Sequence, residues 1–78
     1  MKLEIISAQQ VLFTGEVASA TLPGAMGEFT VLRNHASLLA VLTAGTVRYT
    51  DAAGADGSAE ITGGIADVDN NVISVCVY

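Results

Sequence analysis

Short β-type runs, each ended by a turn signal within about eight to twelve residues, leave little room in this chain for long helices. The runs alternate apolar and polar residues, as in Met1–Ser7, and they stop at Gly, Pro, Asn or Asp. This pattern predicts about eight to ten short strands in an antiparallel sandwich or barrel. Residues 36–42 are rich in Leu and Ala and could form a helix, but the segment is too short for a stable isolated helix.

The segment Leu22–Leu42 organises the predicted fold, because it holds the only proline and the only histidine of the chain. Pro23-Gly24 is a turn dipeptide, since proline presets the first corner and glycine accepts a positive φ at the second. We expect strands at 29–32 and 37–42 and a loop at 25–28 between the turn and the first of them. Loops carried by a rigid β scaffold are common places for binding residues.

The remaining glycines and asparagines predict further turns. Gly15-Glu16 is expected to turn the chain between strands 11–14 and 17–22. Gly63-Gly64 suggests a bulge or a corner where the chain crosses between sheets. Asn70-Asn71 suggests a two-residue hairpin turn, because Asn tolerates the left-handed conformation.

The composition predicts one small domain that covers residues 1–78 and leaves some apolar side chains exposed. Of the 78 residues, 51% are hydrophobic and only 14% are charged, against about 25% charged in a typical domain. A chain of this size has much surface for its volume, so some apolar side chains must stay exposed, which favours an interface with a partner. The alternative is a sparsely charged monomer.

The net charge of −5 argues against nucleic acid as a partner, because the three basic residues, Lys2, Arg33 and Arg48, are scattered along the chain. Residues 51–78 carry acids and no base. These acids either lie in solvated turns or form a face that meets a basic partner.

No combination of residues predicts catalysis, a cofactor or a metal. His35 is the only candidate base and has no nucleophile or second ligand near it in sequence. Cys76 is alone, so it forms no internal disulfide, and we expect it to be a small core residue. Gly24 and Gly27 lack the Gly-Lys-Ser/Thr of a phosphate loop. We expect no signal peptide at the start, and no apolar run approaches the roughly 18 residues of a membrane span.

Several motifs follow one another in an order and spacing found in a known family. They are Ser7–Gly15; Leu22-Pro23-Gly24; Gly27-Glu28-Phe29; His35-Ala36-x-Leu38-Leu39; Gly45-x-Val47-Arg48; and Gly63-Gly64-Ile65-x-x-Val68 followed by Asn71-Val72-x-x-Val75. Together they resemble the N-terminal domain of the epsilon subunit of the rotary F-type ATP synthase, over nearly the whole chain.

The resemblance implies a β-sandwich of two stacked five-stranded sheets, about ten short strands in all. It also implies a non-catalytic rotor subunit of the central stalk, without a cofactor, that binds the gamma subunit and the c ring and couples ion-driven rotation to ATP synthesis or hydrolysis. The alpha and beta subunits are then partners through the complex. Membrane association comes only through the complex, on the cytoplasmic face of the bacterial plasma membrane.

The same resemblance assigns residues to two surfaces. The loop that faces the c ring matches Ala25, Met26, Gly27 and Glu28. The side that faces gamma matches Ser7, His35, Leu39 and Ala40. From the residues alone, Glu28 is equally an ordinary solvated loop acid. Family members usually continue into a helical hairpin that binds ATP or blocks hydrolysis, so a chain that ends at Tyr78 is expected to do neither.

Two other functions compete with this interpretation. The first is a free-standing β-sandwich module that binds a carbohydrate or a peptide, which predicts aromatic side chains gathered on one face. The four aromatic residues, Phe13, Phe29, Tyr49 and Tyr78, are spread through the chain, which argues against sugar stacking. The second is a small enzyme that uses His35, which lacks catalytic partners.

Overall fold

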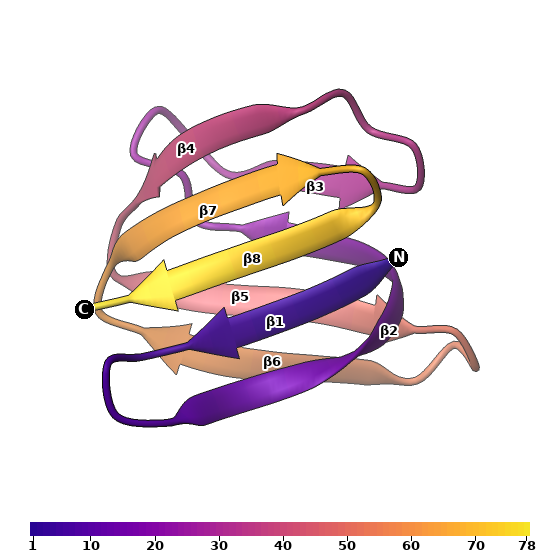
Figure 1. Ribbon diagram of the computed structural model, residues 1–78, viewed down its shortest axis with the longest axis horizontal. Coiled ribbons are helices and arrows are strands. Elements are labelled where there is room, and N and C mark those ends of the chain that lie inside the picture. Colours follow the sequence, from indigo (N-terminus) through magenta and orange to yellow (C-terminus); the bar gives the residue numbers. More distant parts are fainter.

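The computed structural model describes residues 1–78 and contains eight strands and no helix (Figure 1). The strands are β1 (Lys2–Ile6), β2 (Val11–Leu22), β3 (Phe29–Leu32), β4 (Leu38–Leu42), β5 (Gly45–Asp51), β6 (Asp56–Ile61), β7 (Gly64–Asp69) and β8 (Val72–Val77). The predicted all-β class is confirmed, but the strands number eight instead of about ten. Residues 36–42 contribute the strand β4 and not a helix.

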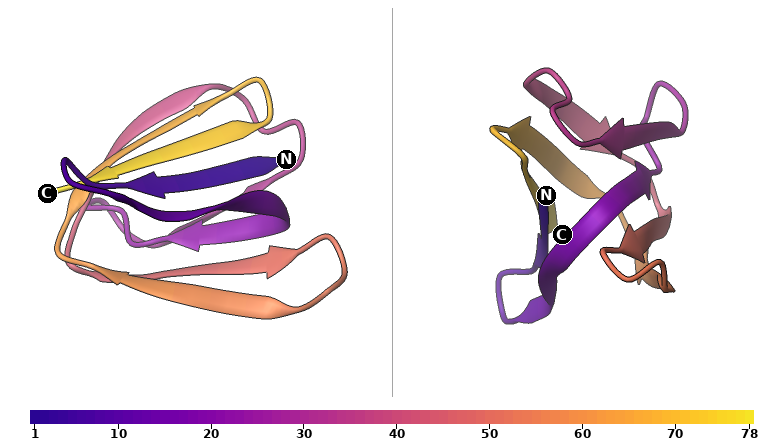
Figure 2. Two further views of the ribbon diagram at one scale, coloured as in Figure 1. Left: turned by 60° about the horizontal axis from the view of Figure 1, so that its bottom comes forward. Right: turned by 90° about the vertical axis from the view of Figure 1, so that its right-hand side faces the viewer.

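The strands form two layers that are packed face to face (Figure 2). The first sheet has the order β4-β7-β8-β1-β2, and the second sheet joins β3, β2, β5 and β6, with β2 shared between them. The resemblance implied two five-stranded sheets, and the second sheet has only four strands. The β-sandwich itself is as predicted.

One long strand, β2, replaces the two strands that were expected on either side of Gly15-Glu16. The prediction of a turn there is wrong, because Gly15 lies opposite Leu3 and Glu16 opposite Lys2 in the ladder with β1. The first half of β2 pairs with β1, and its second half pairs with β3 and β5. Figure 2 (right) shows the strand crossing from one layer to the other.

A β-bulge lets β2 serve both sheets. Val17 is opposite Asp51 and Ser19 is opposite Thr50, so Ala18 is an extra residue between two pairs. Because of the extra residue, the two inward-facing residues Val17 and Ala20 are three positions apart instead of the usual two. A bulge also increases the local twist of a strand, which helps it to change sheets.

The first sheet is not purely antiparallel. Strands β1 and β8 run parallel, with Leu3 opposite Ile73 and Ile5 opposite Val75. Every other pair of neighbouring strands is antiparallel. As a result the two chain ends, which lie on adjacent strands, emerge at opposite ends of the sandwich (Figure 1).

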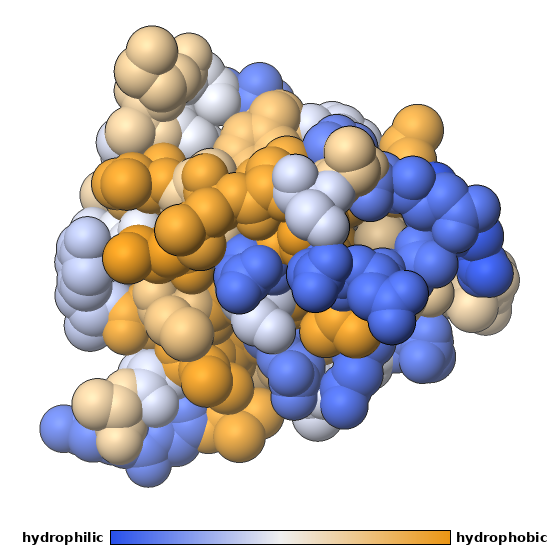
Figure 3. Space-filling view, turned by 45° about the horizontal axis from the view of Figure 1, so that its top comes forward, coloured by the Kyte–Doolittle hydropathy of each residue, from blue (hydrophilic) through white to orange (hydrophobic).

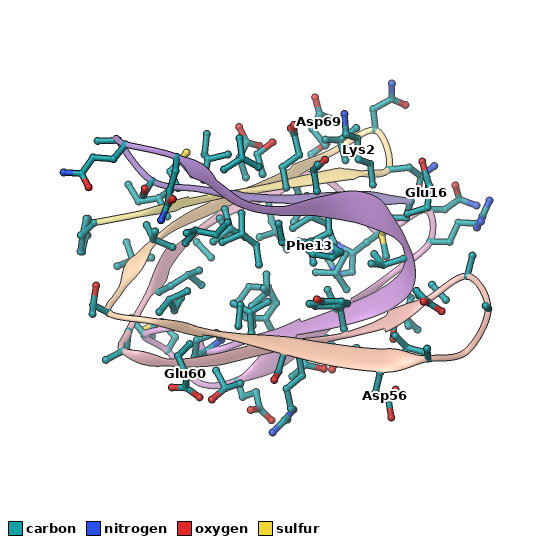
Figure 4. The ribbon with its side chains drawn as sticks, turned by 90° about the horizontal axis from the view of Figure 1, so that it is seen from below. Lys2, Phe13, Glu16, Asp56, Glu60 and Asp69 are labelled. Carbon is teal, nitrogen blue, oxygen red and sulfur yellow. The ribbon has the colours of Figure 1, made fainter.

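The core fills the space between the sheets with apolar side chains only. The fourteen buried hydrophobic residues are Met1, Leu3, Ile5, Val17, Ala20, Leu22, Val31, Leu42, Val47, Ile61, Ala66, Val68, Ile73 and Val75. Phe13 points inward between the layers (Figure 4), and its ring centroid lies 4.3 Å from that of Tyr49. Because strand residues alternate between faces, this inner set fixes which residues face outward.

Two of the predicted turns are observed. Asn70 and Asn71 have φ values of 51° and 62°, the left-handed conformation that a two-residue hairpin turn needs. Gly63, with φ of 135°, and Gly64 stand where the chain leaves the second sheet at β6 and enters the first at β7.

Candidate functional site

An apolar stripe crosses the outer face of the first sheet from one edge to the other. Its five residues are successive neighbours across the strands: Val41 in β4, Ile65 in β7, Cys76 in β8, Ile6 in β1 and Val11 in β2. Val11, Val41 and Ile65 are 61%, 57% and 42% exposed. A contiguous exposed apolar patch of this kind is typical of an interaction surface.

On the same outer face, the rows of residues further from the apolar stripe are mostly polar. The next row across the sheet runs Leu39, Asp67, Ser74, Glu4 and Thr14. The row beyond it contains Asp69, Val72, Lys2 and Glu16. In Figure 3 the hydrophobic side chains gather left of the centre and most hydrophilic ones lie to the right, with a second hydrophilic cluster at the lower left. The apolar stripe therefore lies at one end of the sandwich.

The outer face of the second sheet is different, because apart from the exposed Leu32 it carries mainly hydroxyl groups and charges. Thr21 and Thr30 share a hydrogen bond of 2.9 Å, and the hydroxyl of Thr50 donates to the Asp56 carboxylate at 2.9 Å. Asp56 and Glu60 point away from the sandwich in Figure 4. A polar hollow of about 410 Å³ on this face is lined by Ser19, Thr21, Arg48, Tyr49, Thr50, Asp56, Gly57 and Ser58. The outer face of the first sheet is therefore the one with a contiguous apolar surface, whereas Leu32 on the second sheet lies among polar groups.

The loop between β2 and β3 lies beside the edge strand β4 of the first sheet. The N–H of Ala25 donates to the Val41 carbonyl at 2.8 Å, and the N–H of Thr43 donates to the Pro23 carbonyl at 2.8 Å. Within the loop, the N–H of Gly27 donates to the carbonyl of Gly24 at 3.0 Å. These bonds fix the loop against the sheet.

The tip of this loop is fully presented to solvent. Met26 is as exposed as in an extended chain, at 102%, and Gly27 has a φ of 127° that a side chain would strain. The Glu28 carboxylate lies 3.0 Å from the Arg48 guanidinium, and both side chains are more than half exposed. An ion pair this exposed stabilises little, at most about 1 kcal/mol.

An apolar groove lies between the tip of this loop and the side chains of β4, and we call it the β4 groove. It has a volume of about 480 Å³ and is lined by Gly24, Ala25, Met26, Gly27, Phe29, Leu39, Ala40 and Val41. It brings together residues from both of the surfaces that the sequence predicted, the loop 25–28 and the pair Leu39 and Ala40. Val41 belongs to the groove and to the apolar stripe, so the two surfaces are continuous.

Ser7 and His35, the other two predicted residues, lie at opposite ends of the sandwich. Ser7 directly follows Ile6 at the end of β1, and its hydroxyl oxygen accepts hydrogen bonds from the N–H groups of Gln9 and Gln10 at 3.3 and 3.2 Å. The segment 33–37 with His35 joins β3 to β4 at the end where the chain begins (Figure 1). Ser7 thus borders the apolar stripe, whereas His35 does not.

His35 sits in an exposed loop and contacts no catalytic partner. Its Nδ1 is 2.7 Å from the carbonyl of Ala36. The loop is held to the β7–β8 turn, because the Asn71 side-chain oxygen accepts from the Asn34 N–H at 2.6 Å and its amide donates to the Asn34 side chain at 2.9 Å. The Ser37 hydroxyl donates to Asp69 at 2.6 Å. The position of this loop is therefore well defined.

Sequence reasoning missed most of the apolar stripe and misplaced one of its members. Cys76 was expected in the core but is exposed, because Ile73 and Val75 take the inward positions of β8. The sequence did contain a signal for this surface, namely an apolar residue at a strand position whose side chain faces outward. Ile65 alternates in step with Asp67 and Asp69, so its side chain could have been assigned to the same outer face from the sequence.

The acids of residues 51–78 do not gather on one face. Asp67 and Asp69 are on the outer side of the first sheet, whereas Asp56 and Glu60 are on the outer side of the second (Figure 4). The single acidic face considered for a basic partner is not formed. No three His, Cys, Asp or Glu side chains are grouped as they would be around a metal ion, and the chain has no helix of the length and apolarity needed to cross a membrane.

Residues 1–78 match the family described as the ATP synthase delta/epsilon chain, beta-sandwich domain. The chain belongs to this family. Curated relatives named ATP synthase epsilon chain agree with it: the protein from Wolinella succinogenes is 42% identical over 88% of this chain and 53% of its own length. The protein from Chlorobium limicola is 40% identical over 90% of this chain and 80% of its own length. The chain thus spans about half of some delta/epsilon relatives and most of others.

Two solved structures share the delta/epsilon sandwich fold. A chain in the Euglena gracilis mitochondrial ATP synthase, described as OSCP/F1/c-ring, superposes with a TM-score of 0.88 at 25% identity, over 96% of this chain and 48% of that one. A chain in the Tetrahymena thermophila mitochondrial ATP synthase, described as central stalk/c-ring, has a TM-score of 0.80 at 16% identity, over 99% and 62%. The second likeness concerns the fold alone.

Proposed function

We propose that this chain is the β-sandwich of a non-catalytic rotor subunit in the central stalk of an F-type ATP synthase. It binds the gamma subunit through the apolar stripe and the c ring through the loop 25–28, and it couples ion-driven rotation to ATP synthesis or hydrolysis. Family membership over residues 1–78 supports the assignment to the ATP synthase. The apolar stripe is the single observation that carries the gamma contact.

The asymmetry between the two outer faces supports the choice of surface for gamma. Val41 and Ile65 remain half exposed on the free chain, although a β-branched apolar side chain gains about 1.5–3 kcal/mol from full burial. On the other sheet, hydroxyls and carboxylates bond one another and stay hydrated. A partner that covers the apolar stripe therefore removes apolar area from water at little polar cost. Leu39, Ala40 and Ser7 border this surface.

The loop 25–28 suits a second, smaller contact. It combines a fully exposed apolar tip at Met26 with a carboxylate at Glu28. Main-chain hydrogen bonds to β4 hold its base, so the tip can bear on another surface without losing its position. Such a contact fits the exposed loops of a ring of c subunits.

The relatives from Wolinella and Chlorobium are bacterial proteins. By extension, the chain would reside on the cytoplasmic face of the bacterial plasma membrane, attached through its complex. The alpha and beta subunits would be partners through the complex and not through direct contact. A carbohydrate-binding module finds less support, because Phe13 and Tyr49 stack on each other inside the sandwich and form no exposed platform.

Site-specific photocrosslinking tests both contacts in one assembled enzyme. A photoreactive phenylalanine analogue is placed at Ile65, at Met26, or at Ser58 on the outer face of the second sheet as the control, in an ATP synthase assembled with this chain as its epsilon subunit. We expect adducts with gamma from position 65, with a c subunit from position 26, and with neither from position 58. Adducts with gamma from position 58 and none from position 65 would refute the assignment of the gamma surface.

A further inference from the structure

The loop 25–28 is attached to the sandwich differently at its two ends. At its start, the N–H of Ala25 donates to the Val41 carbonyl at 2.8 Å, which ties this end to β4 in the first sheet. At its far end the chain enters β3, which pairs with β2 in the second sheet. Glu28 lies between these attachments and makes no main-chain hydrogen bond. The main chain therefore leaves Glu28 without an anchor of its own.

Gly27, directly before Glu28, makes this part of the loop easy to reorient. Its φ is 127°, and apart from its chain neighbours no heavy atom lies within 4 Å of the position that a Cβ would take. Glycine has more conformational freedom than any other residue, and no side chain packs over this one. The direction of the tip with Met26 is therefore well defined only if a further contact restrains the loop near Gly27.

The Arg48 guanidinium supplies a contact of this kind. Its Nη2 lies 3.0 Å from Oε1 of Glu28. Arg48 extends from the outer face of β5, where it stands opposite Thr21 of β2 and Ser58 of β6. Because these neighbours are short and neutral, they offer the guanidinium no ion pair and leave it free to extend to the loop. The ion pair thus attaches the far end of the loop to the second sheet.

The pairing between these two side chains is exclusive. Asp56 and Glu60, the acids of β6, are hydrogen-bonded to threonine hydroxyls of β5 and form no ion pair with Arg48. Arg48 is also the only Lys or Arg in the strands of the second sheet. Glu28 and Arg48 are therefore each other's only ion-pair partner.

We propose, on the basis of the function proposed above for the loop 25–28, that Arg48 is a positioning residue for the contact with the c ring. It holds Glu28 against the second sheet and so sets the direction in which Met26 is presented. Arg48 acts through Glu28 and makes no contact with the ring itself. Because both side chains are more than half exposed, the ion pair adds little to the stability of the sandwich. Its loss should therefore move the loop and leave the fold intact.

Photocrosslinking in the assembled ATP synthase measures the effect of Arg48 on this contact. The photoreactive phenylalanine analogue is placed at Met26, and the yield of adducts with the c subunit is compared between the parent and two variants. Arg48→Glu puts two like charges side by side, and we expect the yield to fall about two- to fivefold. The matched control is Arg33→Glu, which changes the net charge equally and lies beyond the other end of β3. It should leave the yield unchanged.

Exchanging the two charges separates positioning from direct contact. Arg48→Glu combined with Glu28→Arg keeps an ion pair but reverses the charge that the loop presents. We expect this exchange to restore the adduct yield of the parent. A yield that stays low would show that Glu28 contacts the c subunit directly, and it would overturn the proposal. The same conclusion would follow if Arg48→Glu left the yield unchanged or if Arg33→Glu lowered it equally.

Relaxation measurements on the ¹⁵N-labelled free chain distinguish this inference from the proposed function. We expect the order parameters of the Gly27 and Glu28 amides to fall in Arg48→Glu and to return in the exchanged pair. A parent enzyme that gives no adduct from position 26 would refute the contact with the c ring, whereas unchanged order parameters would refute the positioning by Arg48. If Arg48→Glu does not fold, Arg48→Gln removes the charge without adding repulsion and permits the same comparisons.

Discussion

Replacing Val41 and Ile65 together by threonine should release the gamma subunit from the sandwich while the sandwich itself stays folded. The two residues are direct neighbours across β4 and β7 and are 57% and 42% exposed. Threonine keeps the β-branched shape that suits a strand. Exposed substitutions of this kind change the free energy of unfolding by about 0.5 kcal/mol or less.

The loss in binding follows from what each threonine brings to the interface. Each exchange removes apolar carbon, worth about 0.8 kcal/mol per methylene when fully transferred and about half of that here, because the side chains are already half buried. Each also carries a hydroxyl into an apolar contact, which costs about 1–3 kcal/mol without a partner. The pair should therefore lose at least about 3 kcal/mol, which raises the Kd for gamma by about 100-fold or more.

Isothermal titration of the purified gamma subunit measures this change directly. The matched control is Leu32→Thr, because Leu32 is 58% exposed and lies on the outer face of the second sheet, opposite Ser19. It should leave the Kd unchanged. A double variant that melts normally and binds gamma with nearly the parental Kd would refute the reasoning, as would an equal loss from Leu32→Thr.

Three further predictions concern the scaffold. Deleting Ala18 leaves Val17 and Ala20 two positions apart, so both still face inward, but it removes the added twist by which β2 changes sheets; this should cost about 1 kcal/mol and lower the Tm by roughly 4–8 °C in circular dichroism, and an unchanged Tm would show that β2 crosses between the sheets without the bulge. Gly64→Ala places a methyl group against the main-chain carbonyl of Cys76, which should cost about 2 kcal/mol or more and lower the Tm by roughly 8–16 °C; a Tm within a few degrees of the parent would contradict this. Arg48→Gln breaks only the exposed ion pair with Glu28, so the Tm should fall by less than about 8 °C, because such pairs contribute at most about 1 kcal/mol, and a larger fall in calorimetry would mean that Arg48 also packs.

Alternation and turn chemistry were enough to predict most of the fold. Asn70-Asn71 and Gly63-Gly64 have conformations that few other residue pairs adopt, so their roles could be deduced from their identity. Gly15 misled the prediction, because glycine is as compatible with a strand that bends sharply as with a turn. Which of the two occurs depends on the long-range pairing with Leu3, which no local pattern encodes.

The candidate site was predictable only in part, for a similar reason. The loop 25–28 is where it was expected, but the turn predicted at Pro23-Gly24 is wrong, because Gly24 is bridged to Leu42 and the turn runs from Gly24 to Gly27, with the positive φ at Gly27. The apolar stripe is made by five residues on five strands, and it exists only because the register aligns Ile6 with Cys76 and Cys76 with Ile65. Each of these residues alone looks like any half-buried strand position. Whether such a residue is part of an interaction surface depends on strand neighbours that are distant in sequence.

The parallel pairing of β1 with β8 has a consequence for how the protein is made. The last strand of the sandwich to be synthesised, β8, belongs in the middle of the first sheet, between β7 and β1. Until it arrives, the ladder edge of β1 stays open and the inner face of the sheet is incomplete, so the sandwich cannot close during translation. Folding of the sandwich must wait until β8 has been synthesised, and such non-local closure is slow. A nascent chain of this kind exposes two unpaired apolar half-sheets, which makes it a natural client for chaperones.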